Sequence, residues 1–259
     1  MQQGVDILFS VAPLNRLRQL EMERLLPYFP SGARILELGA GTGQQARFIA
    51  EHGFDVIAID LPNSNYAAER VFEVQNYDGR NIPLPDDSVD VVFSSNVLEH
   101  VEDLPTVLAE LKRVQRPGGF GLHLMPTPSW RFWTFLTGFV TAAQAAGLLA
   151  KHLVNPPAGQ ARWGAVRRDA RTIAGGLIPM GHGTSPEGIS ELWTFSPRAW
   201  RRTFGKNGFT VLDDRPFGLF YTGAILFGDR IKIAKRERLG RTLCSAVHNY
   251  IVEPAPNSR

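Results

Sequence analysis

The chain has 259 residues, of which 44% are hydrophobic and 20% are charged, and its formal net charge is +3. This length can bury a sizeable core and fits one α/β domain with an insertion better than two independent domains. The composition excludes a disordered chain and one embedded throughout in a membrane. Cys244 is the only cysteine, which excludes an intramolecular disulfide and a cysteine cluster for zinc or iron–sulfur.

The N-terminal region predicts no export signal. Met1 to Ser10 carry no basic segment, and their apolar stretch is too short for a signal peptide. Together with the single cysteine, this leads us to expect a cytoplasmic protein. Apolar residues then recur at helical spacing from Leu14 to Phe29, which predicts an amphipathic helix.

A β-α-β unit follows this helix. Arg34 to Leu38 reads as a buried strand, Gly39 to Gly43 as a turn, and Gln44 to His52 as a helix. Asp55 to Ile59 predicts a second strand, whose continuous apolar character is typical of central parallel strands.

Strands and helices continue to alternate. We predict a short strand over Val71 to Gln75, a strand over Val89 to Ser94, a helix over Leu104 to Val114 and a fifth strand over Phe120 to Met125. This order indicates a parallel, doubly wound sheet with right-handed crossovers.

The alternation breaks at Pro126 and resumes near Ser196. A capped helix is predicted over Pro197 to Lys206, and two closing strands over Phe209 to Asp213 and Leu219 to Phe227. We therefore expect a Rossmann-like, mainly parallel seven-stranded sheet from residues 1–125 and 196–259. We expect residues 126–195 to form an inserted, mostly helical cap after the fifth strand, with a role in recognising the acceptor.

The most informative motif is E-L-G-A-G-T-G at Glu37 to Gly43. A glycine turn at the end of a strand lets the backbone approach a ligand closely, and the next helix directs its first N–H groups at it. Asp60 lies 21 residues after Gly39, where a carboxylate can accept hydrogen bonds from ribose hydroxyls. The pair predicts a nucleoside ligand; the G-x-G-x-G spacing disfavours NAD without excluding it.

The chain resembles class I S-adenosylmethionine (SAM)-dependent methyltransferases of the ubiquinone/menaquinone-methyltransferase-like type (methyltransferase type 11). The matching segments, in order, are Glu37 to Gly43, Asp60, Asp78 to Asp90, Asn96 to His100, and R-P-G-G at Arg116 to Gly119. The likeness covers about Ala33 to Leu124 well and Phe195 to Phe227 loosely, and it does not cover the insertion.

The resemblance implies a SAM site and assigns residues to it. The positions it places around the cofactor are Glu37, Gly39, Ala40, Gly41, Thr42 and Gly43 at the methionine moiety, Asp60 at the ribose with Leu61 beside it, Asp78 and Gly79 at the adenine, and Asn96 near the sulfonium. The alternatives are that the glycines only make a turn, that Asp60 caps a helix, and that Asp78 belongs to an Asx turn.

Three histidines are candidate catalytic residues on the acceptor side: His100, His182 and His123, with Glu187 and Glu191 as further candidate bases. For each histidine the alternative is a structural role. Some relatives carry E-x-x-E-H, with the look of metal ligands, where this chain begins with Asn96. Losing one negative ligand weakens such a site, so we expect no metal.

The insertion contains 19 residues without a charge, Phe132 to Ala150. A helical lid over the acceptor site is the leading interpretation, and an interfacial helix or a true membrane span are the alternatives. Gly175-Gly176, Pro179 to Gly183, Trp193 and Phe195 read as loops that carry specificity.

These observations favour a SAM-dependent methyltransferase acting on a small-molecule or lipid-linked acceptor, with O-methylation favoured and S-adenosylhomocysteine released. The alternatives are a non-catalytic SAM-binding scaffold and a nicotinamide-dependent oxidoreductase. The segment from Arg198 to Arg241 carries 11 basic residues against 4 acidic ones. This excess indicates either a solvated basic face or a contact with an anionic surface. Peripheral membrane contact through 130–154 or 230–241 stays open, as does the oligomeric state, whereas nucleic acid is disfavoured.

Overall fold

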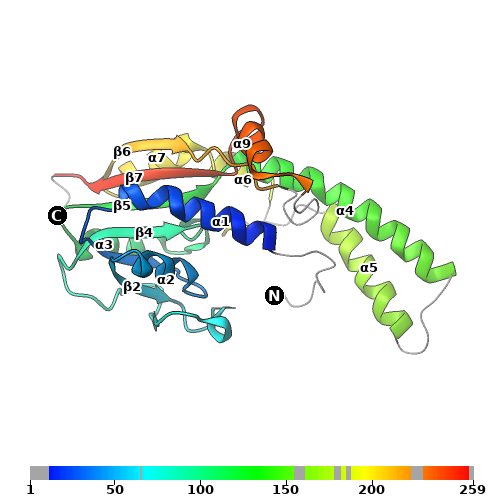
Figure 1. Cartoon of the computed structure of the whole chain (residues 1–259), viewed down its shortest axis with the longest axis horizontal. Coiled ribbons are helices and arrows are strands. Elements are labelled where there is room, and N and C mark those ends of the chain that lie inside the picture. Colours follow the sequence, from blue (N-terminus) through cyan, green and yellow to red (C-terminus); the bar gives the residue numbers. More distant parts are fainter. Residues whose placement is uncertain are drawn as a thin grey trace.

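The computed structural model describes residues 12–64, 66–154, 161–177, 182–184, 188–222 and 230–256. Within them, helices cover a central sheet and a long helical hairpin projects from one end of it (Figure 1). The elements, in chain order, are α1 (Ala12–Leu25), η1 (Leu26–Tyr28), β1 (Arg34–Leu38), α2 (Gln44–Glu51), β2 (Asp55–Asp60), η2 (Ala67–Glu69), β3 (Val74–Asn76), β4 (Val89–Ser95), η3 (Leu98–His100), α3 (Leu104–Val114), β5 (Gln115–Pro126), α4 (Pro128–Val154), α5 (Ala161–Leu177), α6 (Glu191–Thr194), α7 (Pro197–Lys206), β6 (Phe209–Pro216), α9 (Ile233–Thr242) and β7 (Val247–Pro254).

The sheet has seven strands in the order β3-β2-β1-β4-β5-β7-β6. The first five pair in parallel, and β7 runs antiparallel to both β5 and β6. The predicted fold class, a Rossmann-like and mainly parallel seven-stranded sheet, is confirmed.

Alternate residues of each central strand face opposite sides of the sheet, which is why the strands read as continuous apolar runs. In β1, Leu36 and Leu38 pack with α3 and α7 on one face, whereas Ile35 packs with α1 and α2 on the other. The two apolar layers fix the register of the sheet and hold the carboxyl ends of the parallel strands at one edge.

One predicted strand was wrong. The strand between β5 and β6 is Val247–Pro254, not Leu219 to Phe227; residues 219–222 are not in a strand, and 223–227 lie outside the described residues. Gly121↔Val252 and Val211↔Val252 pair across β7. Sequence periodicity cannot rank two apolar segments that compete for one place in a sheet, because the pairing is non-local.

The insertion is more helical than predicted. Gly175 and Gly176, expected in a loop, lie in the last turn of α5. Helices α4 and α5 run side by side away from the sheet, so only the first turns of α4 lie near the strand ends (Figure 1). Among the described residues there is one helix, Pro128–Val154, that is both long enough and apolar enough to cross a membrane.

Candidate cofactor and acceptor site

The glycine turn after β1 adopts a backbone that side chains disfavour. Gly39 and Gly43 have φ of +71° and +75°, in the left-handed region. A Cβ on Gly39 would lie 2.6 Å from a methyl carbon of Val97, so this position also lacks room for a side chain. The amides of Gly39 and Ala40 both donate to the carbonyl of Ile59, at 2.8 and 3.0 Å. The turn is thereby tied to the end of β2.

Three predicted parts of the cofactor site lie at the ends of three neighbouring strands: Asp60 at β2, the glycine turn at β1 and Asn96 at β4. Asp60 ends β2, and its Oδ2 accepts a hydrogen bond from the amide of Gly41 at 2.9 Å. Asn96 follows β4 with φ of +54°, and its amide donates to the carbonyl of Leu124 at 2.8 Å. The strand order reverses between β1 and β4, and ligands of open α/β sheets bind at such a switch point.

Glu37 supplies a buried carboxyl beneath the glycine turn. Its side chain is 1% exposed, and its Oε2 has no hydrogen-bond partner among the described residues. Burial raises its pKa to about 8, against the effect of a hydrogen bond from the Ala46 backbone in the first turn of α2. An orphaned carboxyl oxygen beside an open backbone turn fits a ligand that brings a cationic or hydrogen-bonding group, as the amino group of SAM does.

Asp78 makes an Asx turn, one of the two roles the sequence left open. Its Oδ1 accepts from the amides of Arg80 and Asn81 at 2.8 and 2.7 Å, and these hydrogen bonds lower its pKa to about 2. Gly79 has φ of +84°, and a Cβ there would lie 3.1 Å from a methyl of Leu61. The predicted residues Leu61 and Gly79 are therefore neighbours, at the same edge as Asp60.

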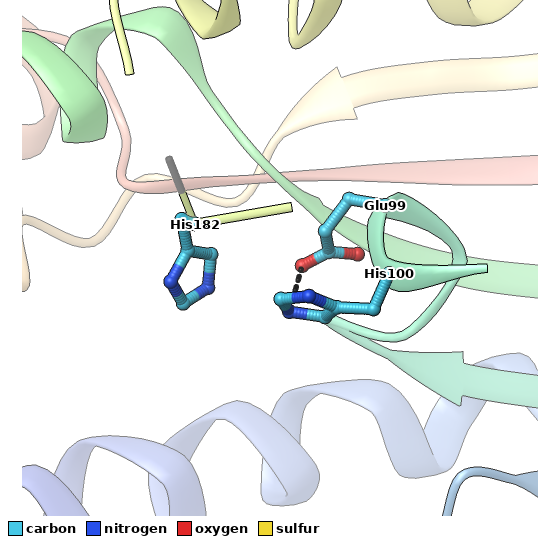
Figure 2. A group of neighbouring side chains, drawn as sticks. All are labelled: Glu99, His100 and His182. Carbon is cyan, nitrogen blue, oxygen red and sulfur yellow. Dashed lines mark ion pairs between the residues drawn. The ribbon is translucent and has the colours of Figure 1, made fainter. Parts of the chain in front are cut away.

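A carboxylate and two imidazoles meet on the other side of Asn96. Figure 2 shows the Glu99, His100 and His182 side chains turned toward one another. The Nε2 of His100 lies 3.8 Å from Oε1 of Glu99, and the rings of His100 and His182 are 4.8 Å apart. Burial raises the pKa of Glu99 to about 8, lowers that of His182 to about 4 and lowers that of His100. At neutral pH the cluster is therefore mostly uncharged.

A buried ion pair holds His182 against this cluster. Nε of Arg131 lies 2.9 Å from Oε2 of Glu191, and both side chains are buried. Oε1 of Glu191 accepts hydrogen bonds from the amides of His182 and Gly183, the latter at 2.7 Å. Glu191, predicted as a candidate base, thus orients the segment that carries His182.

His123 does not lie with the other two histidines. It is 1% exposed within β5, hydrogen-bonded to the Ser94 hydroxyl at 2.8 Å and stacked on Phe204 at 5.7 Å. Burial lowers its pKa to about 3. The structural alternative describes this residue, because its inward-facing position in β5 keeps it from the strand ends. Glu187 lies outside the described residues.

The sequence interpretation missed Trp130 and the role of Arg131. Trp130 packs edge-on against His182 with ring centroids 4.8 Å apart, so the first turn of α4 walls the cluster. A lone arginine between a strand and a long uncharged stretch was the available signal, since a charge in apolar surroundings needs a partner.

Glu99, His100 and His182 also have the donor types of a divalent-metal site. Their ligand atoms lie within 4.8 Å of one another. One carboxylate and two imidazoles are three of the four ligands that zinc prefers. The arrangement can therefore move a proton or hold a cation, and only the second use would be sensitive to a chelator.

Comparison with known proteins identifies the domain. The model of a methyltransferase domain family matches residues 36–122. The malonyl-[acyl-carrier protein] O-methyltransferase of Pectobacterium atrosepticum is 37% identical over 112 residues, 40% of this chain and 43% of the relative. That of Serratia marcescens is 43% identical over 103 residues, 38% of this chain and 40% of the relative.

The match spans less than half the length of these two curated relatives. A solved SAM-dependent methyltransferase from Archaeoglobus fulgidus has the same fold, with a TM-score of 0.54 at 18% identity over 93% of this chain and 94% of its own. The matched segment holds the glycine turn, Asp60 and Asn96. The chain therefore carries a methyltransferase domain of the class I, SAM-dependent family.

Proposed function

We propose that this chain transfers a methyl group from SAM to an oxygen of a small-molecule or lipid-linked acceptor. One juxtaposition carries the proposal. The glycine turn, Asp60 and Asn96 lie at three neighbouring strand ends, and η3, with Glu99 and His100, begins two residues after Asn96. A nucleoside site and a proton-accepting cluster are therefore adjacent.

The cofactor half follows from the residues of that edge. Asp60 is placed for the ribose hydroxyls, the turn from Gly39 to Gly43 for the methionine moiety, and the buried Glu37 for its cationic amino group. Asn96 separates this half from the acceptor cluster. Bound SAM supplies an activated methyl group, so the protein's main tasks are orientation and exclusion of water.

The acceptor half requires a group that takes the proton from a hydroxyl as its oxygen is methylated. The side chain of His100 is 43% exposed and can meet an acceptor, while Glu99 beside it is fully buried. Because burial lowers its pKa, His100 is neutral at neutral pH and able to accept a proton. Glu99 is itself protonated at neutral pH, because burial raises its pKa to about 8, and it would stabilise the imidazolium as a carboxylate only near that pH.

The two relatives support oxygen as the methylated atom, because both are named O-methyltransferases. The match to the methyltransferase family ends at residue 122, before α4 and α5. The match therefore includes Glu99 and His100 but not the inserted helices α4 and α5, which border the acceptor cluster through Trp130.

The two rivals are a nicotinamide-dependent oxidoreductase and a SAM-binding scaffold, and binding separates the first. Calorimetric titration with S-adenosylhomocysteine should give saturable binding, and NAD should give none. Asp60→Ala should weaken binding at least about tenfold, since charge-assisted hydrogen bonds contribute roughly 1.5–3 kcal/mol.

Asp55→Ala is the matched control, because Asp55 opens the same strand at the opposite edge of the sheet. A folded sample that binds NAD and not S-adenosylhomocysteine would refute the proposal. Binding of S-adenosylhomocysteine without turnover across hydroxyl, thiol and amine acceptors would favour the scaffold.

A further inference from the structure

The hairpin of α4 and α5 is packed through small residues. A Cβ on Gly138 would lie 2.7 Å from the carbonyl oxygen of Gly176, and one on Gly176 would lie 2.4 Å from that of Gly138. Ala142 and Ala145 of α4 and Ala165 of α5 are the buried apolar side chains of the hairpin. Helices in a membrane, where lipid removes the hydrophobic driving force for association, pack in this way, with their backbones brought close over glycine and alanine.

The large apolar side chains of the hairpin point outward. In α5 the exposed ones are Trp163 and Leu177, and in α4 they are Phe132, Leu136, Phe139, Val140, Leu148, Leu153 and Val154. The spacing of three to four residues from Phe132 through Leu136 to Phe139 and Val140 places these four side chains along one side of α4. Only 11% of its apolar 18-residue window is buried. This is the reverse of a soluble hairpin, which buries its large side chains.

The exposed charges of the hairpin are basic. Helix α5 exposes Arg167, Arg168 and Arg171 and carries a single acid, Asp169. Asp169 is buried and paired with His152 of α4 at 2.7 Å, so the exposed charge is positive. Four arginines on α5, together with its length of 17 residues, argue against a two-helix span and favour a position at the interface.

A second basic element lies at the root of the hairpin. Helix α9 exposes Lys232 at its N-cap, Lys235, Arg238 and Arg241. It is tied to α4 because Nε1 of Trp133 donates to the carbonyl of Leu243, the C-cap of α9, at 3.1 Å. Figure 1 shows α9 beside the first turns of α4. Basic side chains therefore lie on α5, alongside the apolar helix α4, and on α9 at its root, and such basic clusters attract anionic headgroups.

We infer that the α4–α5 hairpin docks this protein on the surface of an anionic phospholipid bilayer. The outer side of α4 enters the boundary between headgroups and acyl chains, and the arginines of α5 and the cations of α9 contact lipid phosphates. A second inference rests on the proposed function. Since Trp130 at the root of α4 contacts His182, a lipid-linked acceptor would reach the Glu99–His100 cluster from the membrane side.

Vesicle binding tests the docking surface with the whole chain. Sucrose-loaded phosphatidylcholine vesicles with phosphatidylglycerol should sediment the protein, and vesicles of phosphatidylcholine alone should do so several-fold less. Phe139→Glu should lower the partition coefficient at least about tenfold, because an apolar side chain is lost from the lipid boundary. Arg167→Gln and Arg171→Gln should each lower it about fivefold, and added salt should reduce these losses.

Leu212→Glu is the matched control, since Leu212 is 54% exposed on β6, far from the hairpin. It should bind vesicles as the wild type does. Wild-type protein that fails to sediment with anionic vesicles overturns the inference, as does a hairpin dimer in light scattering that Phe139→Glu dissociates without any vesicle binding.

Calorimetry with S-adenosylhomocysteine on the same samples separates the two proposals. Phe139→Glu should keep full affinity for it. Nucleoside binding without vesicle binding leaves the methyltransferase standing and refutes the docking surface, whereas vesicle binding without nucleoside binding does the opposite.

Discussion

Substituting the buried carboxyl of Glu37 should raise the stability of the folded protein at neutral pH and lower its affinity for the cofactor. The pKa of Glu37 is raised from 4.5 to about 8 by burial, so the folded protein holds a proton that the unfolded chain releases. Stability is therefore lost as pH rises from about 4.5 to about 8 and levels off above that. Glu37→Gln removes this dependence because its amide does not titrate.

The size of the effect follows from the two pKa values. Holding the proton costs about 4 kcal/mol of unfolding free energy at pH 7.5 and about 1 kcal/mol at pH 5.5. The stability of Glu37→Gln relative to the wild type should therefore rise by about 2 to 3 kcal/mol between these pH values. For a domain of this size that corresponds to a change of about 5 to 10 °C in the Tm difference.

Cofactor binding should show the opposite effect. A cationic ligand group beside Glu37 favours its ionised form, so the affinity for S-adenosylhomocysteine should increase from pH 6 to pH 8 as binding releases a proton. Glu37→Gln should bind at least about tenfold more weakly and lose this pH dependence. Calorimetry in buffers of different ionisation enthalpy measures the proton released.

Glu21→Gln is the control for burial alone. Glu21 in α1 is 1% exposed, and burial raises its pKa to about 7, but the groups that interact with it are those of Tyr221 and Arg18, not those of the glycine turn. It should show a pH-dependent change in Tm with unchanged nucleoside affinity. The reasoning is refuted if the Tm difference between Glu37→Gln and the wild type is the same at pH 5.5 and 7.5, or if the two bind S-adenosylhomocysteine equally.

The remaining predictions concern the acceptor side. His100→Ala should lower kcat about 10²- to 10⁴-fold and abolish the increase of kcat/KM with rising pH below pH 7. Glu99→Gln should abolish only a further increase of kcat/KM near pH 8. An unchanged pH profile in both variants would show that neither side chain takes part in proton transfer. Arg131→Met leaves Glu191 buried without its ion pair and should lower the free energy of unfolding by about 3–5 kcal/mol. The double variant that adds Glu191→Gln should lose less, and thermal melts in which the second substitution lowers the Tm as much as the first would contradict this coupling. Turnover should survive a chelator such as EDTA, and a loss restored by Zn²⁺ would instead assign Glu99, His100 and His182 as metal ligands.

Much of the fold and of the cofactor edge could be predicted from local patterns. The glycine turn, Asp60 and Asn96 each follow a buried strand, and carboxyl ends of parallel strands share one edge, so strand order in the sequence already groups them. The acceptor side could not be predicted in this way. Nothing in the sequence distinguishes His123 from His182, yet His123 lies in the core and His182 contacts His100.

The sequence by itself determined the elements whose signals are local: apolar periodicity, capping residues and the positive-φ glycines of the turn. Only the tertiary structure decided which segment closes the sheet, which histidines meet, and that the long apolar helix packs through glycine and alanine with Phe132 and Phe139 exposed. Those features depend on contacts between residues far apart in the chain. Their free energies arise only when the whole chain is assembled, so no local window of sequence contains them.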